Sequence, residues 1–336
     1  MVRLKDIAAR AGVSTMTVSK VLHNAPDISA ATKARVRQLA QEMGYVPDSM
    51  AQGLRSRTTK LFGLVISSTD NPIFARTVSA IEEAAFEAGY DIILTHSLNQ
   101  LEREQAGIRR LLSRRVDGLF LSPVYRLAPT AAVYEELQKR KTPTVILGHR
   151  APFCSQFVGV ETDDFAASQN LTRHLLELGH RRIAFFAGPA ASPAAAERLE
   201  GHKRALRDAK VDHDDRLIFA AGSTIEEGEK AALQFLDEKP GATAVQTFND
   251  LVAIGAATIF LNQGLKIPQD LSLAGFGNIL TAEYFRVPLT TVRQPKFRMG
   301  VAAFEMMTGL LRGERPASKR LAAEIIARAS TAAPPN

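Results

Sequence analysis

Residues 13–22, VSTMTVSKVL, place several side chains that can contact a nucleic acid on one side of a short helix. The apolar residues fall on one side at helical spacing. The opposite side carries Thr15, Met16, Ser19 and Lys20. Short hydroxyls reach phosphates or bases, a methionine can meet a thymine methyl, and a lysine can donate to guanine O6 and N7. This combination predicts contact with double-stranded DNA.

Three helices are expected to position this face. Residues 4–11 carry apolar side chains at helical spacing, and Gly12 breaks the pattern. Ser14 stands where the second helix needs a cap, and Ser29 precedes a third helix that ends at Gly44. Two short helices joined at a glycine and braced by a third form a helix-turn-helix, whose second helix enters the major groove. A three-helix bundle used for protein contact is the alternative interpretation.

Positive charge gathers near the N-terminus. The chain of 336 residues has a net charge of +7, and residues 1–60 hold ten Lys or Arg against four Asp or Glu. The rest of the chain holds 32 basic and 31 acidic side chains. This asymmetry favours a polyanionic partner for the N-terminal unit alone, although a solvated basic arm would have the same composition.

The segment that follows, residues 47–60, has the pattern of a marginal helix. Pro47 ends the preceding element, and Ala51 and Leu54 would share one side, with Arg55 adjacent. A helix this short is not stable by itself in water. Either a partner holds the segment in place or it is a flexible linker.

From residue 61 onward, short apolar stretches alternate with helical patterns such as those near 74–88 and 101–115. The stretches that predict strands are LFGLVIS, YDIILTH, DGLFLSP, TPTVILG, FVGVET, RRIAFFAG, RLIFAAG, ATAVQTF and LSLAGFG. Such alternation is typical of parallel sheets covered on both faces, and this many units exceed one sheet. The predicted fold class is an all-α helix-turn-helix domain followed by an α/β domain of two lobes, each a doubly wound parallel sheet.

Polar side chains gather in the loops after these strands, where open α/β sheets bind their ligands. The loops read STDNPIF, SPVY, GHRAP, ETDD, GPAASPAAAERLEG, FND and GFGN. Their amides, carboxylates, arginines and aromatics predict a cleft for a small polar molecule. The sequence lacks a Walker A segment, H-E-x-x-H, G-x-S-x-G and a full dinucleotide fingerprint. We therefore expect no enzyme activity, metal or cofactor.

Composition also bears on the compartment. The single cysteine, Cys154, forms no disulfide framework and fits a reducing environment. The chain begins MVRLKDIAAR, without an apolar signal region, and no stretch of about 20 apolar residues occurs. The expectation is a cytoplasmic protein without a membrane span.

The whole chain resembles the LacI/GalR family of bacterial transcription regulators. The segments that carry the resemblance are LKDIAARAGVSTMTVSKVL, VPDSMAQGLRSR, GHRRIAFFAGP, AERLEGH and VPLTTVRQPKFRMG, in the family's order. The resemblance implies a homodimeric repressor that binds a pseudo-palindromic DNA operator. It also implies two lobes, similar to periplasmic sugar-binding proteins, that hold a small-molecule effector.

The resemblance also suggests a division of the chain. A helix-turn-helix domain would take residues 1–46, a hinge helix 47–60, and the lobes 61–330, followed by a flexible tail at 331–336. The N-lobe would comprise 61–160 and 292–320, and the C-lobe 161–291 and 321–330.

The family's DNA contacts carry over position by position. Those implied for the helix-turn-helix are Ser14, Thr15, Met16, Thr17, Ser19, Lys20 and His23. Those implied for the hinge are Ala51, Leu54 and Arg55. Thr15, Met16 and Lys20 would read bases in the major groove. Leu54 would enter the minor groove as a wedge, which costs a few kcal/mol of base unstacking.

Effector contacts are implied for both lobes. They are Asn71, Phe74, Tyr125, His149, Asp163, Arg198, Asn249, Asp250 and Gly277. Arg198 matches the family's ligand-binding arginine. Two departures matter, because Gly277 stands where many relatives carry an aspartate and Ser223 stands where an aromatic often stacks on the ligand. Both argue against a simple transfer of a familiar sugar or purine.

The charge of the effector stays open at this stage. Arg198, joined by His149 and Arg150, would suit a sugar acid or sugar phosphate through the bidentate geometry of arginine. The preferred alternative pairs Arg198 with Asp163 inside the protein and leaves a neutral sugar as the ligand.

Other function classes also remain, namely a solute-binding receptor, a DNA-anchored sensor without a specific operator, and an enzyme with a DNA-binding appendage. The basic N-terminal helices and the missing signal region count against the receptor.

Overall fold

The computed structural model describes residues 2–46 and 58–335, and the chain forms two compact units, residues 1–59 and 60–336. The first unit contains α1 (Leu4–Ala11), α2 (Thr15–Leu22) and α3 (Ala30–Glu42). Ile7, Val18, Val21 and Val36 are fully buried at its centre. The predicted apolar and outward faces of α2 are confirmed, because Met16 stays 69% exposed while the valines are buried.

Local sequence explains where these helices begin and end. Gly12 follows α1 with a φ of 64°, a conformation that glycine adopts without a steric penalty. Ser14 and Ser29 cap α2 and α3, since each hydroxyl accepts a backbone N–H, at 3.1 and 3.3 Å. The three predicted helices and both predicted caps are therefore confirmed.

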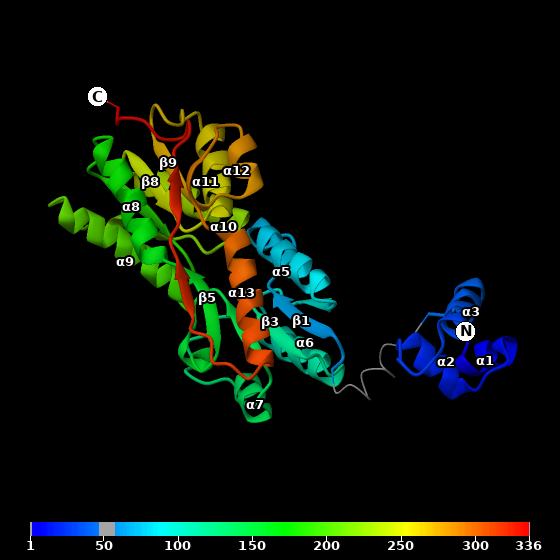
Figure 1. Cartoon of the computed structure of the whole chain (residues 1–336). Coiled ribbons are helices and arrows are strands. Elements are labelled where there is room, and N and C mark those ends of the chain that lie inside the picture. The colour runs from blue at the N-terminus through cyan, green and yellow to red at the C-terminus, as the bar shows by residue number, and fades with distance from the viewer. Residues whose placement is uncertain (1, 47–57, 336) are drawn as a thin grey trace. The chain divides into compact units, whose positions relative to one another are not determined.

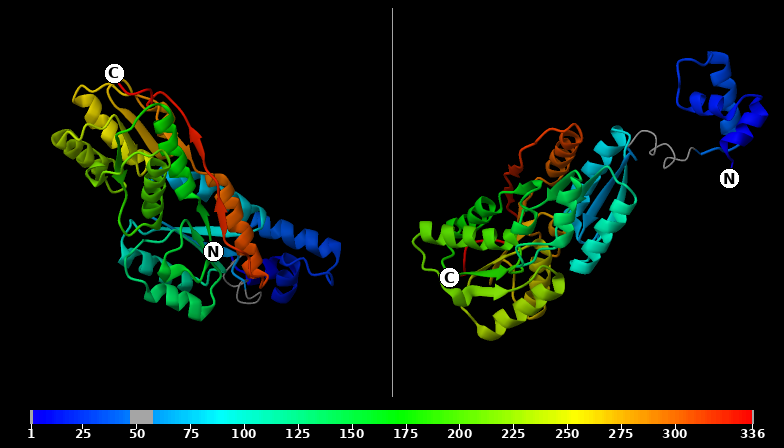
Figure 2. Two further views of the ribbon diagram at one scale, coloured as in Figure 1. Left: turned by 90° about the vertical axis from the view of Figure 1, so that its left-hand side faces the viewer. Right: turned by 90° about the horizontal axis from the view of Figure 1, so that it is seen from below.

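The second unit consists of two lobes, each built around one six-stranded sheet (Figure 1). The N-lobe sheet has the strand order β11-β5-β4-β3-β1-β2 and is parallel throughout. Its strands are β1 (Leu61–Ile66), β2 (Asp91–His96), β3 (Gly118–Leu121), β4 (Thr144–Leu147), β5 (Val158–Thr162) and β11 (Lys319–Leu321). Its helices are α5 (Ala75–Glu87), α6 (Leu101–Ser113), α7 (Ala132–Arg140) and α13 (Lys296–Leu311). Figures 1 and 2 show α13 beside α5, although the two helices are far apart in the sequence.

The C-lobe sheet has the order β12-β10-β9-β8-β6-β7. Its strands are β6 (Ile183–Ala187), β7 (Ile218–Ala220), β8 (Ala244–Thr247), β9 (Ser272–Gly277), β10 (Thr290–Arg293) and β12 (Glu324–Ile326). Its helices are α8 (Asp164–Glu177), α9 (Pro193–Asp208), α10 (Ile225–Glu238), α11 (Asp250–Asn262) and α12 (Leu280–Tyr284). The predicted fold class is confirmed, with the addition that β12 runs antiparallel to β10.

Apolar side chains form the hydrophobic core of each lobe. In the N-lobe, the rings of Phe62 and Tyr90 stack with centroids 4.2 Å apart. In the C-lobe, Phe186, Phe235 and Phe260 meet at tilted or edge-on angles. Throughout the two described ranges, no helix has both the length and the apolar character needed to span a bilayer.

The chain passes between the lobes three times, after Thr162, after Arg293 and after Leu321. The predicted boundaries at 160, 291 and 320 fall inside β5, β10 and β11, so each is one or two residues early. An apolar pattern locates the end of a strand only approximately. Figure 1 shows β11 and β12, in red, following one another along the two lobes.

The C-terminal segment, expected as a flexible tail, forms hydrogen bonds to the C-lobe through Thr331 and Ala332. The N–H of Ala332 donates to the Ser272 hydroxyl at 3.0 Å, and its C=O accepts from Nε2 of His180 at 2.9 Å. The hydroxyls of Thr331 and Thr290 lie 2.8 Å apart. Because these partners are distant in the sequence, the small and proline residues of the tail gave no sign of them.

Acidification below about pH 6.5 is expected to destabilise the C-lobe through His202. This buried ring lies 5.0 Å from that of Phe185, and burial lowers its pKa from 6.5 to about 3. Between these two pKa values, His202 is protonated in the unfolded chain but stays neutral in the folded chain. The contribution is fully present above pH 6.5 and is lost as the pH falls toward 3.

Urea titrations measure this contribution as the free energy of unfolding against pH. Within that window, His202 should lower the free energy of unfolding by about 1.4 kcal/mol per pH unit. A His202→Leu variant should show a shallower decline than the wild type. An equally steep decline would assign the acid sensitivity to other groups.

Candidate functional site

The outward face of α2 is the candidate DNA-reading surface. The structure places all seven predicted residues of this unit on α2 or at its two ends, namely Ser14, Thr15, Met16, Thr17, Ser19, Lys20 and His23. Thr17 and Ser19 are half-buried, and the other five are exposed. The predicted hinge contacts Ala51, Leu54 and Arg55 lie outside the described residues, so their role stays a prediction.

Some of these side chains already have partners within the unit. The hydroxyls of Ser14 and Thr17 lie 2.9 Å apart. Nζ of Lys20 donates to Oδ2 of Asp27 at 2.5 Å, and this bond lowers the pKa of Asp27. The cation at the end of α2 is thus held by an acid that sequence reasoning did not single out.

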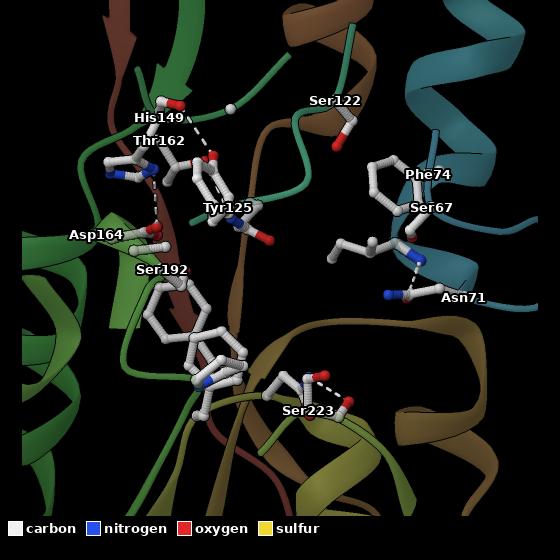
Figure 3. Close-up of a pocket in the computed structure, with 18 of the residues that line it drawn as sticks. Ser67, Asn71, Phe74, Ser122, Tyr125, His149, Thr162, Asp164, Ser192 and Ser223 are labelled. Carbon is white, nitrogen blue, oxygen red and sulfur yellow. Dashed lines mark hydrogen bonds and ion pairs between the residues drawn. The ribbon is translucent and has the colours of Figure 1, made fainter. Parts of the chain in front are cut away.

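A cavity of about 550 Å³ lies between the two lobes of the second unit. Figure 3 shows Phe74 and Ser122 on one side of the space and His149 and Asp164 on the other. The structure brings together seven of the nine predicted effector residues at this cavity, namely Asn71, Phe74, Tyr125, His149, Arg198, Asn249 and Asp250. Loops after strands of both sheets supply the lining, as expected for α/β folds.

Asp163 and Gly277 are not among the residues that line the cavity, which corrects two predictions. Asp163 caps α8 by accepting a backbone N–H at 3.1 Å, and it pairs with Arg320 at 3.0 Å. Its neighbour Asp164 lines the cavity instead, because successive helical residues point about 100° apart. Gly277 has a φ of 134°, and a Cβ added there would lie 3.1 Å from Ile73, so the backbone leaves little room for a side chain.

Arg198 is buried in the cavity wall, with 7% of its surface exposed. Nη1 donates to the C=O of Phe248 at 2.6 Å, and Nη2 donates to Oδ2 of Asp164 at 3.2 Å. The guanidinium lies 3.7 Å from the ring centroid of Phe276. Burial raises the pKa of Asp164 against the lowering effect of Arg198. Arg198 thus has an internal partner, which is Asp164 and not the predicted Asp163.

Two further buried ionisable residues, Lys296 and Asp250, line the cavity, and only Asp250 was predicted. Lys296 lines the cavity, and its Nζ donates to the C=O of Asn278 at 3.0 Å. Burial lowers its pKa from 10.5 to about 8, with the charge of Asp250 opposing this effect. Asp250 accepts from the Thr291 hydroxyl at 2.5 Å and from the N–H of Ile279 at 2.9 Å. Lys296 follows β10, a strand that the apolar pattern did not predict, so no signal placed it here.

Asn249 and Tyr125 at the cavity are engaged in hydrogen bonds within the protein. Asn249 accepts from the N–H of Val252 at 2.8 Å and donates to the C=O of Ser223 at 2.9 Å. The Tyr125 hydroxyl donates to the C=O of His149 at 2.8 Å, and burial raises its pKa. Further polar lining residues that were not predicted include Ser67, Ser122, Thr162, Ser192 and Gln294. Hydroxyls, aromatic rings and a few charged groups form a site suited to a small polar molecule.

Both units match models of one family. Residues 3–48 match the model described as bacterial regulatory proteins, lacI family. Residues 59–329 match the model described as periplasmic binding proteins and sugar binding domain of LacI family.

Individual relatives agree over nearly the whole chain. The chain is 33% identical over 334 residues to the HTH-type transcriptional repressor CytR of Escherichia coli K12, covering 99% of this chain and 97% of the relative. It is 33% identical over 307 residues to the repressor PurR of Vibrio atlanticus, covering 91% of each chain. Among solved structures, the lac repressor dimer bound to operator and the anti-inducer ONPF matches with a TM-score of 0.85 and 26% identity, covering 99% of both chains.

A helix-turn-helix unit joined to a two-lobed ligand-binding unit defines a DNA-binding transcriptional regulator under the control of a small molecule. The chain belongs to the LacI family of bacterial regulatory proteins.

Proposed function

We propose that the protein is a homodimeric repressor that binds a pseudo-palindromic operator and releases or tightens its hold when a small uncharged polar molecule enters the cavity. The observation that carries the proposal is the outward face of α2. Its exposed Thr15, Met16 and Lys20 supply a hydroxyl, a thioether and an ammonium group on one short helix. Such a face fits the donor and acceptor pattern of the major groove.

Genomic footprinting of the protein in its native host tests DNA recognition directly. The expected result is an enriched inverted repeat with a flexible central step, because a symmetric dimer reads two half-sites. The absence of any enriched motif would contradict the repressor. It would favour a DNA-anchored sensor without a specific operator.

The paired charges of the cavity favour an uncharged effector such as a sugar or sugar derivative. Arg198 is paired with Asp164, and Nζ of Lys296 donates to the C=O of Asn278. An anion that binds Arg198 would have to displace the buried carboxylate of Asp164, which is costly. Isothermal titration should therefore detect neutral sugars. Heat from sugar acids or sugar phosphates, with none from neutral sugars, would reverse this assignment.

Exposed apolar side chains on both lobes support the homodimer. Phe86 of α5 is 75% exposed, and Leu280 and Tyr284 of α12 are 74% and 76% exposed. Contiguous exposed apolar side chains mark protein interfaces, and Leu280 and Tyr284 lie one turn apart on α12. β2 is also an edge strand of its sheet, and Leu94 on it is partly exposed.

Replacing Tyr284 with arginine is expected to weaken self-association. A buried aromatic at the centre of an interface contributes about 2 kcal/mol or more, which corresponds to roughly a thirtyfold rise in the dimer dissociation constant. Sedimentation equilibrium measures this constant. A Leu127→Arg variant is the control, because Leu127 is also exposed but lies in the loop after β3. Equal weakening in both variants would indicate general damage to the lobes.

A further inference from the structure

Glu197, in the first turns of α9 in the C-lobe, binds two cationic side chains of the N-lobe. Its Oε2 lies 3.1 Å from Nε2 of His149, which follows β4. Arg320, in β11, donates to Oε1 at 3.0 Å and to Oε2 at 2.7 Å. The Glu197 carboxylate therefore joins the lobes through a bidentate arginine and an imidazole.

Neighbouring contacts follow the same arrangement, with cations on the N-lobe and acids on the C-lobe. Nδ1 of His149 lies 3.6 Å from Oδ2 of Asp164, at the start of α8. Arg320 also lies 3.0 Å from the carboxylate of Asp163, beside the first crossing between the lobes. Glu161 of β5, 3.4 Å from Arg320, adds an acid on the N-lobe side. Any rotation of one lobe against the other must lengthen several of these contacts together.

We propose that Glu197 is a positioning residue that holds the two lobes closed around the cavity, and that it holds them more tightly when His149 carries a charge. Glu197 directly precedes Arg198, so the helix that forms part of the cavity wall is itself tied to the opposite lobe. The inference deepens the proposed function, because it concerns how the effector cavity opens.

The groups that face His149 decide when it is charged. Burial lowers its pKa, but the hydrogen bond to Glu197 and the charges of Asp164, Glu197 and Glu161 outweigh burial and raise the pKa above 6.5. The Tyr125 hydroxyl donates to the backbone C=O of His149, and it stays a neutral donor because burial raises its pKa. The attraction of charged His149 for Glu197 and Asp164 is therefore complete below pH 6.5, and it is lost as the pH rises through the raised pKa of His149.

Glu197 stays ionised across this range. Burial raises its pKa, but the hydrogen bonds and charges of His149 and Arg320 outweigh burial and lower the pKa below 4.5. Arg320 keeps its charge as well, because Asp163 and Glu197 raise its pKa. The change in attraction near neutral pH therefore comes from His149.

Single-molecule fluorescence energy transfer across the cavity mouth tests the proposal on the full chain without a ligand. Dyes are attached through Glu102→Cys of α6 and Lys230→Cys of α10, two exposed positions on opposite lobes. The native Cys154 is fully buried and does not compete for label. Labelled chain is diluted into unlabelled chain so that each dimer carries one dye pair. The ratio of closed to open molecules should fall as the pH rises from about 6 to 9.

E197Q should lower the closed-to-open ratio about threefold to tenfold near pH 6 and flatten its pH dependence. H149Q should flatten the pH dependence in the same way. E200Q is the matched control, because Glu200 is an exposed acid on the same helix and should leave the wild-type profile unchanged. Identical distance distributions in E197Q and the wild type at every pH would overturn the proposal.

A conservative variant separates positioning from folding. R320K keeps the charge but loses the two parallel bonds, so it should shift the ratio less than E197Q while the thermal unfolding midpoint stays close to that of the wild type. If E197Q does not fold, an unchanged ratio in R320K overturns the proposal. These measurements involve no DNA, so their failure leaves operator binding untouched, and a failed footprinting experiment leaves the contacts of Glu197 untouched.

Discussion

Replacing Arg198 with methionine is expected to lower the free energy of unfolding by about 3–5 kcal/mol, because the buried carboxylate of Asp164 loses its hydrogen-bonded cation and keeps only His149 at 3.6 Å. Arg198 is 7% exposed, and Asp164, its partner at 3.2 Å, is 1% exposed. Methionine retains the length of the side chain but donates no hydrogen bond. The C=O of Phe248, which accepts from Nη1 at 2.6 Å, also loses its donor. Urea unfolding of the full chain measures the loss.

Two further variants separate the buried pair from a general effect of the substitution. Arg204→Met changes an exposed arginine of the same helix, paired with Asp208 at 2.8 Å, and should cost less than about 1 kcal/mol. Adding Asp164→Asn to Arg198→Met should recover about half of the loss or more, since no unpaired charge then remains buried. Equal losses in the Arg198 and Arg204 variants would show that the buried pair contributes little.

The helices and the longer strands could be predicted because their signals are local. In α2, the spacing of Val18 and Val21 alone separates the buried face from the face that carries Met16. Ser14 and Ser29 mark helix starts because a short hydroxyl satisfies an N–H of the first turn. The nine predicted strands all form, since each carries an apolar run long enough to be recognised.

The short C-terminal strands could not be predicted, because what stabilises them is distant in the sequence. β11 has three residues, mostly charged, and exists because it pairs with β5. β12 has three residues and pairs with β10. The tail after Ser330 has the composition of a disordered end, yet it finds hydrogen-bond partners on the C-lobe. A reading of local patterns detects none of these pairings.

The sequence predicted the position of the cavity more accurately than it predicted which charged side chains pair there. The loops after parallel strands indicated where the cavity lies, and the family resemblance implied that Phe74, Tyr125 and Arg198 line it. Whether Asp163 or Asp164 faces the cavity depends on the exact residue at which α8 begins, and sequence signals locate helix starts only within one or two residues. Placing Lys296 at the cavity required knowledge of β10, a strand that the apolar pattern did not predict.

Lys20→Ala should weaken binding to the operator by about 1–3 kcal/mol and relax the preference at one base pair, because a lysine at this position can donate to guanine. The measurement is the dissociation constant for the footprinted operator and for random DNA of the same length. Equal losses on both DNAs would make Lys20 a phosphate contact without a base-reading role. Salt concentration must be fixed, since each phosphate contact makes binding salt-dependent.

The ion pair between Lys20 and Asp27, which only the structure reveals, leads to a second test of Lys20. In the free unit its carboxylate holds Nζ of Lys20 at 2.5 Å, so Lys20 must leave or share this partner when it binds DNA. Asp27→Asn removes the charge that restrains the lysine, which should strengthen binding to random DNA and steepen the salt dependence by about one unit of slope. Glu42→Gln makes the same charge change at an exposed site on α3, where Glu42 accepts from Gln38. If both variants strengthen binding to random DNA equally, the change in net charge explains the effect. If only Asp27→Asn reduces the ratio of operator affinity to random-DNA affinity, the ion pair with Asp27 makes Lys20 discriminate between the two DNAs.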